Sequence, residues 1–153
     1  MDLASRMIAI KLNGEHSGEF KDKVSNYYNS YQDLNKKQNE SRSNIESIID
    51  KSFDKDQKDL IFEYLYNNDF KSIDNIINYL PKDKAEKLTD ELTPYLPEYA
   101  SISKGKKSTY KSMKKYLKQN NVGKLNRHRI LKNTKDGNMD KINSIISPDM
   151  TSD

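Results

Sequence analysis

Apolar residues recur along this chain at the three- and four-residue spacing of helices, and the strict alternation typical of strands is absent. The longest pattern begins after Ser17 and keeps one side of a helix largely apolar for about 30 residues. Two polar residues interrupt it, so the pattern fits either one long helix or two helices broken near residues 39–43. The stripe consists of Phe20, Val24, Tyr27, Tyr31, Leu34, Gln38, Ser41, Ile45 and Ile48.

Three shorter helices are predicted after this stripe, each bounded by a capping residue or a proline. Asp54 precedes the first helix, either Asp69 or Ser72 starts the second, and the third covers residues 82–92. Pro94 and Pro97 then mark the end of the folded part, because a regular helix does not hold two prolines in its interior. A helical body is therefore expected to end near residue 97.

The N-terminal residues also show helical spacing. Leu3, Met7 and Ile10 share one stripe behind the capping residue Asp2, which predicts a short helix. Valine occurs only twice and glycine five times, so neither strands nor tight hairpins are favoured. The predicted fold is all-α: a small helical body over residues 1–97, with one long or broken helix and several short helices, followed by an extended basic C-terminal arm.

Charge is distributed unevenly along the chain, and this affects which part of it is expected to fold into the helical body. Residues 101–135 hold twelve Lys and Arg and no Asp or Glu, whereas residues 1–100 hold 14 basic and 19 acidic residues. Residues 136–153 hold one basic and four acidic residues. A run of like charge with few apolar residues does not fold alone. We therefore expect residues 98–135 to form an extended arm with at most one short helix, over residues 108–119.

The chain is expected to finish in a short anchoring helix and tail over residues 136–153. The sequence Asp136-Gly137-Asn138 predicts a turn. Beyond that turn, an apolar triplet supplies a face that can dock. The triplet is Ile142, Ile145 and Ile146.

The basic arm supplies the candidate binding residues. Lys and Arg neutralise phosphates and release counterions, and Tyr110 and Tyr116 could stack on exposed bases or pack beneath the arm. An acidic protein surface would attract the same charges, so DNA, RNA and neighbouring copies of the chain all stay open as partners. The candidate cations are Lys104, Lys106, Lys107, Lys111, Lys114, Lys115, Lys118, Lys124, Arg127, Arg129, Lys132 and Lys135.

The residue pattern gives little support to catalysis. His16 and His128 are the only histidines, and neither stands in a metal-binding spacing. Cysteine is absent, which excludes disulfides and cysteine-bound zinc. Paired carboxylates such as Asp54 and Asp56 suit helix starts, and no phosphate-binding or calcium-binding loop occurs. We therefore expect no enzyme activity, no cofactor and no metal site.

The expected function is that of a non-enzymatic structural or accessory subunit of a large assembly, such as a phage or viral particle. Its basic arm would contact neighbouring subunits or enclosed nucleic acid. The alternatives are a free-standing nucleic-acid-binding accessory protein without sequence specificity, and a small inhibitor or adaptor that docks on an acidic host protein. The N-terminus resembles neither a secretory signal nor a membrane span. An intracellular location, or one within a virus particle, is expected, with no membrane partner.

Overall fold

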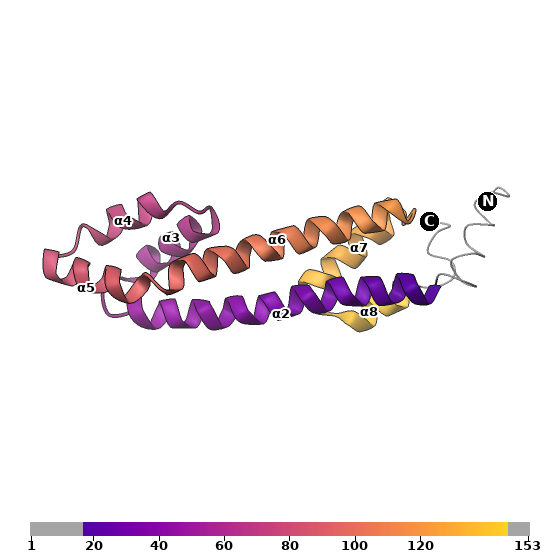
Figure 1. Cartoon of the computed structure of the whole chain (residues 1–153), viewed down its shortest axis with the longest axis horizontal. Coiled ribbons are helices and arrows are strands. Elements are labelled where there is room, and N and C mark those ends of the chain that lie inside the picture. The colour runs from indigo at the N-terminus through magenta and orange to yellow at the C-terminus, as the bar shows by residue number, and fades with distance from the viewer. Residues whose placement is uncertain (1–16, 147–153) are drawn as a thin grey trace. The chain divides into compact units, whose positions relative to one another are not determined.

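The computed structural model describes residues 17–146, which form seven α-helices and no strand (Figure 1). The all-α prediction is therefore confirmed. The N-terminal helix expected after Asp2, the residue His16 and the tail beyond Ile146 lie outside the described residues. The helices are α2 (Ser17–Ile49), α3 (Lys55–Tyr66), α4 (Phe70–Ile77), α5 (Lys82–Leu92), α6 (Tyr95–Gln119), α7 (Lys124–Lys135) and α8 (Met139–Ile145).

The chain divides into two compact units. Residues 34–105 form one of them, here called the central unit, and the described residues 17–33 and 106–146 belong to the other, here called the terminal unit. Each unit buries its own apolar core. Helices α2 and α6 each contribute to both units, so the expected boundary near residue 97 falls inside α6.

The central unit packs the C-terminal part of α2 and the start of α6 with the three short helices that the sequence predicts. The side chains of Ile45, Ile61, Leu65 and Leu92 are fully buried in its core. Local polar contacts help to set where these helices begin, because helix termini leave backbone groups without partners inside the helix.

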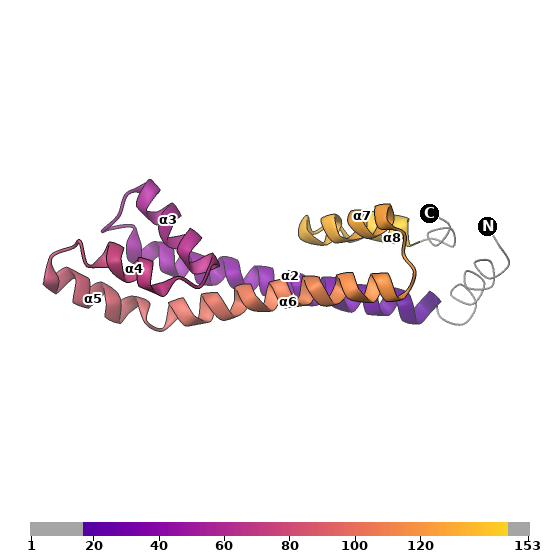
Figure 2. The ribbon, with the colours of Figure 1, turned by 90° about the horizontal axis from the view of Figure 1, so that it is seen from above.

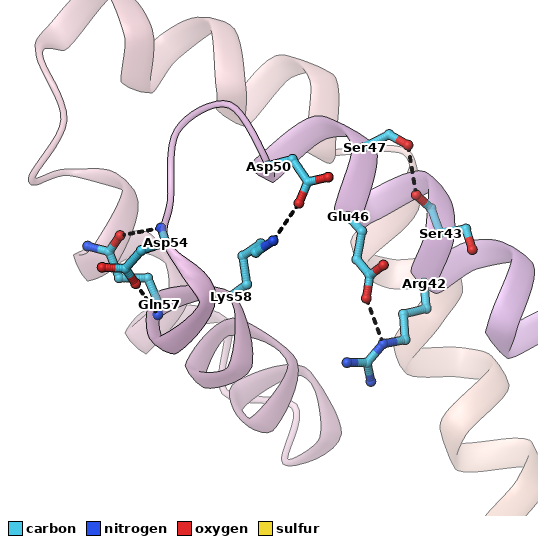
Figure 3. Close-up of polar contacts among 8 residues, drawn as sticks. All are labelled: Arg42, Ser43, Glu46, Ser47, Asp50, Asp54, Gln57 and Lys58. Atoms are coloured by element: carbon cyan, nitrogen blue, oxygen red, sulfur yellow. Dashed lines mark hydrogen bonds and ion pairs between the residues drawn. The ribbon is translucent and has the colours of Figure 1, made fainter.

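Figure 3 shows these contacts at the connection between α2 and α3. The Asp54 carboxylate accepts a hydrogen bond from the Gln57 backbone N–H at 2.8 Å, and the Gln57 side chain accepts one from the Asp54 N–H at 3.0 Å. These reciprocal bonds form the capping box that begins α3. The Lys58 ammonium then contacts the Asp50 carboxylate at 2.6 Å, which joins α3 to the residue that follows α2.

Helix α2 is unbroken over its 33 residues, which settles the alternative between one helix and two. The two polar residues of the stripe lie in the central unit, where Gln38 Nε2 donates to Ser103 Oγ of α6 at 2.7 Å. Ser41 is buried, and its hydroxyl has no hydrogen-bond partner. One of the two polar residues of the stripe, Gln38, thus has a polar partner on α6.

The structure corrects the expected conformation of residues 98–135, which lie in α6 and α7 rather than in an extended arm. Pro94 precedes α6, and Pro97 occupies its first turn, where the missing N–H has no partner to lose. The helix can therefore begin between the two prolines. It continues past Gly105 close to α2, since a Cβ on Gly105 would lie 3.5 Å from the Leu34 side chain.

The terminal unit explains why a highly charged segment can be helical. Its core joins residues about 90 positions apart, because Phe20 and Val24 of α2 pack with Met113 and Leu117 of α6. The short helix α8 contributes two buried isoleucines to the same core, so the apolar triplet expected to act as an anchor packs within its own unit. Figure 2 shows α7 and α8 beside each other in this unit.

Asp69 provides a test of the capping interactions in the central unit. Its carboxylate accepts hydrogen bonds from the Ser72 hydroxyl at 2.6 Å and the Ser72 N–H at 3.2 Å. The hydrogen bond from the Ser72 hydroxyl is the main cause that lowers the pKa of Asp69 below its ordinary value. The bond from the Ser72 backbone N–H is the next cause. The ionised cap therefore stabilises the fold at neutral pH, and this contribution is lost as the pH falls through the lowered pKa.

We expect Asp69→Ala to lower the melting temperature by about 2–5 °C at pH 7, since a helix cap is lost. The difference from the unchanged protein should shrink below about pH 4, where the unfolded carboxyl becomes protonated. Circular dichroism melts at pH 7, 4 and 2.5 measure this, and Asp74→Ala on the same helix is the control. A difference that stays constant with pH would contradict the role of the ionised cap.

Candidate nucleic-acid interface

A row of lysines runs along the solvent-facing side of α6 in the terminal unit. Their positions in the sequence place their side chains on one side of the helix. The row is about 17 Å long, at a rise of about 1.5 Å per residue. Met113 and Leu117, on the opposite side, have no exposed surface. This lysine stripe consists of the exposed residues Lys107, Lys111, Lys114, Lys115 and Lys118.

Helix α7 carries a second cationic face. Its exposed side chains fall within an arc of about 140° when successive residues are placed about 100° apart around the helix. No acidic residue lies in that arc. Ile130, Leu131 and Thr134 occupy the other side and are buried. The cationic face consists of Lys124, Leu125, His128, Arg129, Lys132 and Lys135.

Side-chain contacts hold α7 against α6. The Lys135 ammonium nitrogen lies 4.4 Å from the centre of the Tyr110 ring, a cation–π contact. The Thr134 hydroxyl donates to the Ile130 carbonyl oxygen at 2.9 Å and lies 3.5 Å from the sulfur of Met113. The cationic face of α7 therefore adjoins α6 where Lys135 covers Tyr110.

Helix α2 fixes the C-terminal end of α7. The Gln32 side-chain amide donates to the Thr134 carbonyl oxygen at 2.6 Å, which satisfies a carbonyl in the last turn of the helix. Gly137 follows in the left-handed backbone region with φ of 70°, and a Cβ there would lie 3.4 Å from Gln32 Oε1. Glycine suits this position because its backbone adopts a positive φ without strain. The orientation of α7 is thus set by polar contacts as well as by its buried side.

The two tyrosines proposed to stack on bases are engaged inside the terminal unit. Tyr116 stacks on Phe20 with ring centres 5.8 Å apart, and its ring lies 5.7 Å from that of Tyr27. Burial is the main cause that raises the pKa of Tyr116, and the Glu19 charge is the next. Tyr110 is partly buried beneath Lys135. Tyr116 thus packs against aromatic rings of α2, and Tyr110 lies beneath the Lys135 ammonium.

The two units differ in charge. In the described residues of the terminal unit, 14 Lys and Arg outnumber five Asp and Glu, a net charge of +9. The central unit has 11 basic and 14 acidic residues, a net charge of −3. Burial, and secondly the charge of Lys135, lower the pKa of Lys106. Cations in the terminal unit therefore lie close enough to repel one another, and an anion bound there would relieve that repulsion.

Ten of the twelve predicted cations are exposed, and the terminal unit gathers eleven of the twelve. Lys106 and Arg127 are half-buried and have contacts within the unit. The Lys106 nitrogen lies 5.1 Å from the centre of the Tyr31 ring, and Arg127 Nη1 donates to the Val122 carbonyl oxygen at 3.3 Å. Lys104 is exposed as well and is the one predicted cation that belongs to the central unit.

Folding also adds cations from outside the basic segment 101–135 to the terminal unit. Lys21 and Lys23 of α2 and Lys141 of α8 are exposed and belong to the terminal unit. Sequence gave no signal for them, because they lie among acidic residues and far along the chain from the basic segment. The lysine stripe did carry a signal, since its spacing of three and four residues is that of one helix side.

Residues 17–146 contain neither a cluster of metal ligands nor a helix that could span a membrane. No group of three or more His, Asp or Glu there could hold a metal ion. None of the helices in this range is long and apolar enough to cross a membrane.

Comparisons with protein-family models, with curated proteins and with solved structures found no match to this chain.

Proposed function

We propose that this protein is a non-enzymatic accessory protein that binds nucleic acid through the lysine stripe of α6 and the cationic face of α7. The observation that carries the proposal is the uninterrupted positive charge of two adjoining helices. Neither the stripe nor the face contains a carboxylate that could neutralise its cations. Charge segregated in this way favours a polyanionic partner.

Binding of this kind obtains its affinity from phosphates. Each lysine that contacts a phosphate releases a counterion from the nucleic acid, so affinity is high at low salt and falls steeply as salt is added. Lysines on an ordered helix lose less freedom on binding than lysines on an extended arm, because their backbone is already fixed. Most of the affinity is expected to be independent of base sequence.

A second candidate function is that of a subunit in an assembly of identical copies. Opposite charges on the two units favour it, since the terminal unit of one copy could contact the central unit of another. In a phage or viral particle, the same cations could also face enclosed nucleic acid. Exchange of an extended arm is no longer part of this candidate, because the basic segment is helical.

Equilibrium binding to a random-sequence DNA duplex of 20 base pairs tests the first candidate. At 50 mM salt we expect saturable binding with a Kd of roughly 10 μM or tighter. Absence of saturation at about 100 μM protein would overturn it. Sedimentation of the protein alone separates the candidates, since the first predicts one small species at all salt concentrations. The second predicts larger species that dissociate as salt is raised.

A further inference from the structure

We propose that α7 enters the major groove of duplex DNA while the lysine stripe of α6 contacts the adjacent phosphates. This inference rests on the proposed function and narrows its ligand to B-form duplex. The two cationic helices make different contacts with the DNA in this proposal. The first reason for distinguishing them is the composition of their exposed sides.

The exposed side of α7 has the chemistry of base edges as well as of phosphates. It carries Arg129 and His128, whereas all five residues of the stripe on α6 are lysines. A guanidinium can donate two parallel hydrogen bonds to guanine N7 and O6, and histidine can donate one. Arg129 Nη1 lies 3.5 Å from Asn126 Oδ1 of the same helix, which favours an outward guanidinium fixed near the N-terminal half of α7.

Leu125 adds an apolar group to the same face. Its side chain is 60% exposed although it is surrounded by cations, and the core beneath is filled by other residues. A leucine in water is unfavourable without a partner, whereas thymine presents a methyl group in the major groove. Within the cationic face, Leu125 is therefore the side chain suited to contact a thymine methyl group.

The dimensions of α7 suit the groove. Twelve residues give a helix about 18 Å long, and the B-form major groove is about 12 Å wide and about 8.5 Å deep. Its cationic arc of about 140° is wide enough to present side chains to the floor and both edges of the groove. Asp136 follows directly after the helix and is exposed, so the attractive face ends at Lys135.

Rigid support is the remaining requirement, because side chains read base edges only when their helix is held in place. The buried side of α7 packs in the terminal core through Ile130 and Leu131, and Gln32 fixes its last turn. Neighbouring packed helices lie about 8–10 Å apart, so the stripe on α6 can reach phosphates beside the groove that α7 occupies.

A comparison of three ligands of one sequence tests the proposal with the full chain. The ligands are a 16-base-pair DNA duplex, the corresponding RNA duplex and single-stranded DNA, measured by fluorescence anisotropy. The major groove of A-form RNA is too narrow to admit a helix. We therefore expect the DNA duplex to bind about tenfold more tightly than the RNA duplex at equal salt.

Two double variants separate groove contacts from phosphate contacts. His128→Ala with Arg129→Ala should reduce the preference for DNA duplex over RNA duplex to within about twofold. Lys114→Ala with Lys118→Ala should weaken binding to all three ligands and leave the preference unchanged. All four positions are exposed, and circular dichroism checks that both variants remain folded.

Dimethyl sulfate methylation gives an independent readout, because guanine N7 lies in the major groove. Protection of guanine N7 by the unchanged protein, lost in the α7 variant, is the expected result. Equal affinity for the DNA and RNA duplexes with no N7 protection would overturn groove entry while leaving the proposed function in place. No binding to any of the ligands would overturn both.

Discussion

Replacing Lys111, Lys114, Lys115 and Lys118 together with glutamine is expected to weaken binding to random-sequence duplex DNA by roughly 100-fold or more at 50 mM salt. These residues supply four of the five charges of the lysine stripe, and all four are exposed. Each phosphate contact that is lost removes one released counterion and its favourable entropy. Glutamine keeps the helix propensity of lysine, so α6 should remain intact. Fluorescence anisotropy with a labelled duplex measures the loss.

A matched variant in the central unit controls for net charge. Its four substitutions to glutamine are also at exposed lysines. It should lose less than about threefold in affinity, because exposed charges that do not contact the duplex are screened by salt. An equal loss in both variants would show that binding follows the total charge and has no particular site. The control positions are Lys55, Lys71, Lys82 and Lys87.

The second large effect concerns the folding of the basic segment. Ile130 of α7 is fully buried in the core of the terminal unit. Truncating it should lower the free energy of unfolding by about 2–5 kcal/mol, through lost apolar burial and the cavity that remains. Urea unfolding of Ile130→Ala, followed by circular dichroism, measures this effect.

Leu125→Ala is the control on the same helix, since its side chain is largely exposed. A change within about 0.5 kcal/mol is expected for it. If Ile130→Ala were as mild as Leu125→Ala, α7 would not be packed in the core, and the cationic face would lose its rigid support.

Much of the helical pattern could be predicted from the sequence, because local signals determine it. Asp54 was identified as the cap that begins α3, and the structure confirms it. The start of α4 was left open between Asp69 and Ser72, and the structure shows Asp69 as the cap. The apolar stripe of α2 was identified as well. Its continuity across Ser41 was left open, because the contact of neighbouring Gln38 with Ser103 depends on a residue 65 positions away.

The basic segment was harder to predict for a related reason. Its own apolar residues, such as Met113 and Leu117, are too few to form a core without a partner. Their partners include Phe20 and Val24, about 90 residues earlier in the chain, and no sequence pattern in the segment itself reveals that pairing. Pro97 was interpreted as a helix breaker, although in the first turn of α6 a proline has little cost.

The candidate site was predicted in composition but not in arrangement. Charge counts identify the cations, because acidic residues are absent from the segment. The separation into a stripe on α6 and a face on α7 depends on which sides are buried. Half-burial of Lys106 over the Tyr31 ring likewise depends on a residue far away in the sequence, and so does the stacking of Tyr116 on Phe20.

The salt dependence of duplex binding tests the central claim most directly. Log K for the full chain should fall linearly with the logarithm of the salt concentration, with a slope of about −4 to −6 if roughly five or six phosphates are contacted. The variant lacking four lysines of the stripe should show a slope shallower by about 3. A slope near zero for the unchanged protein, or equal slopes for the two proteins, would contradict the account.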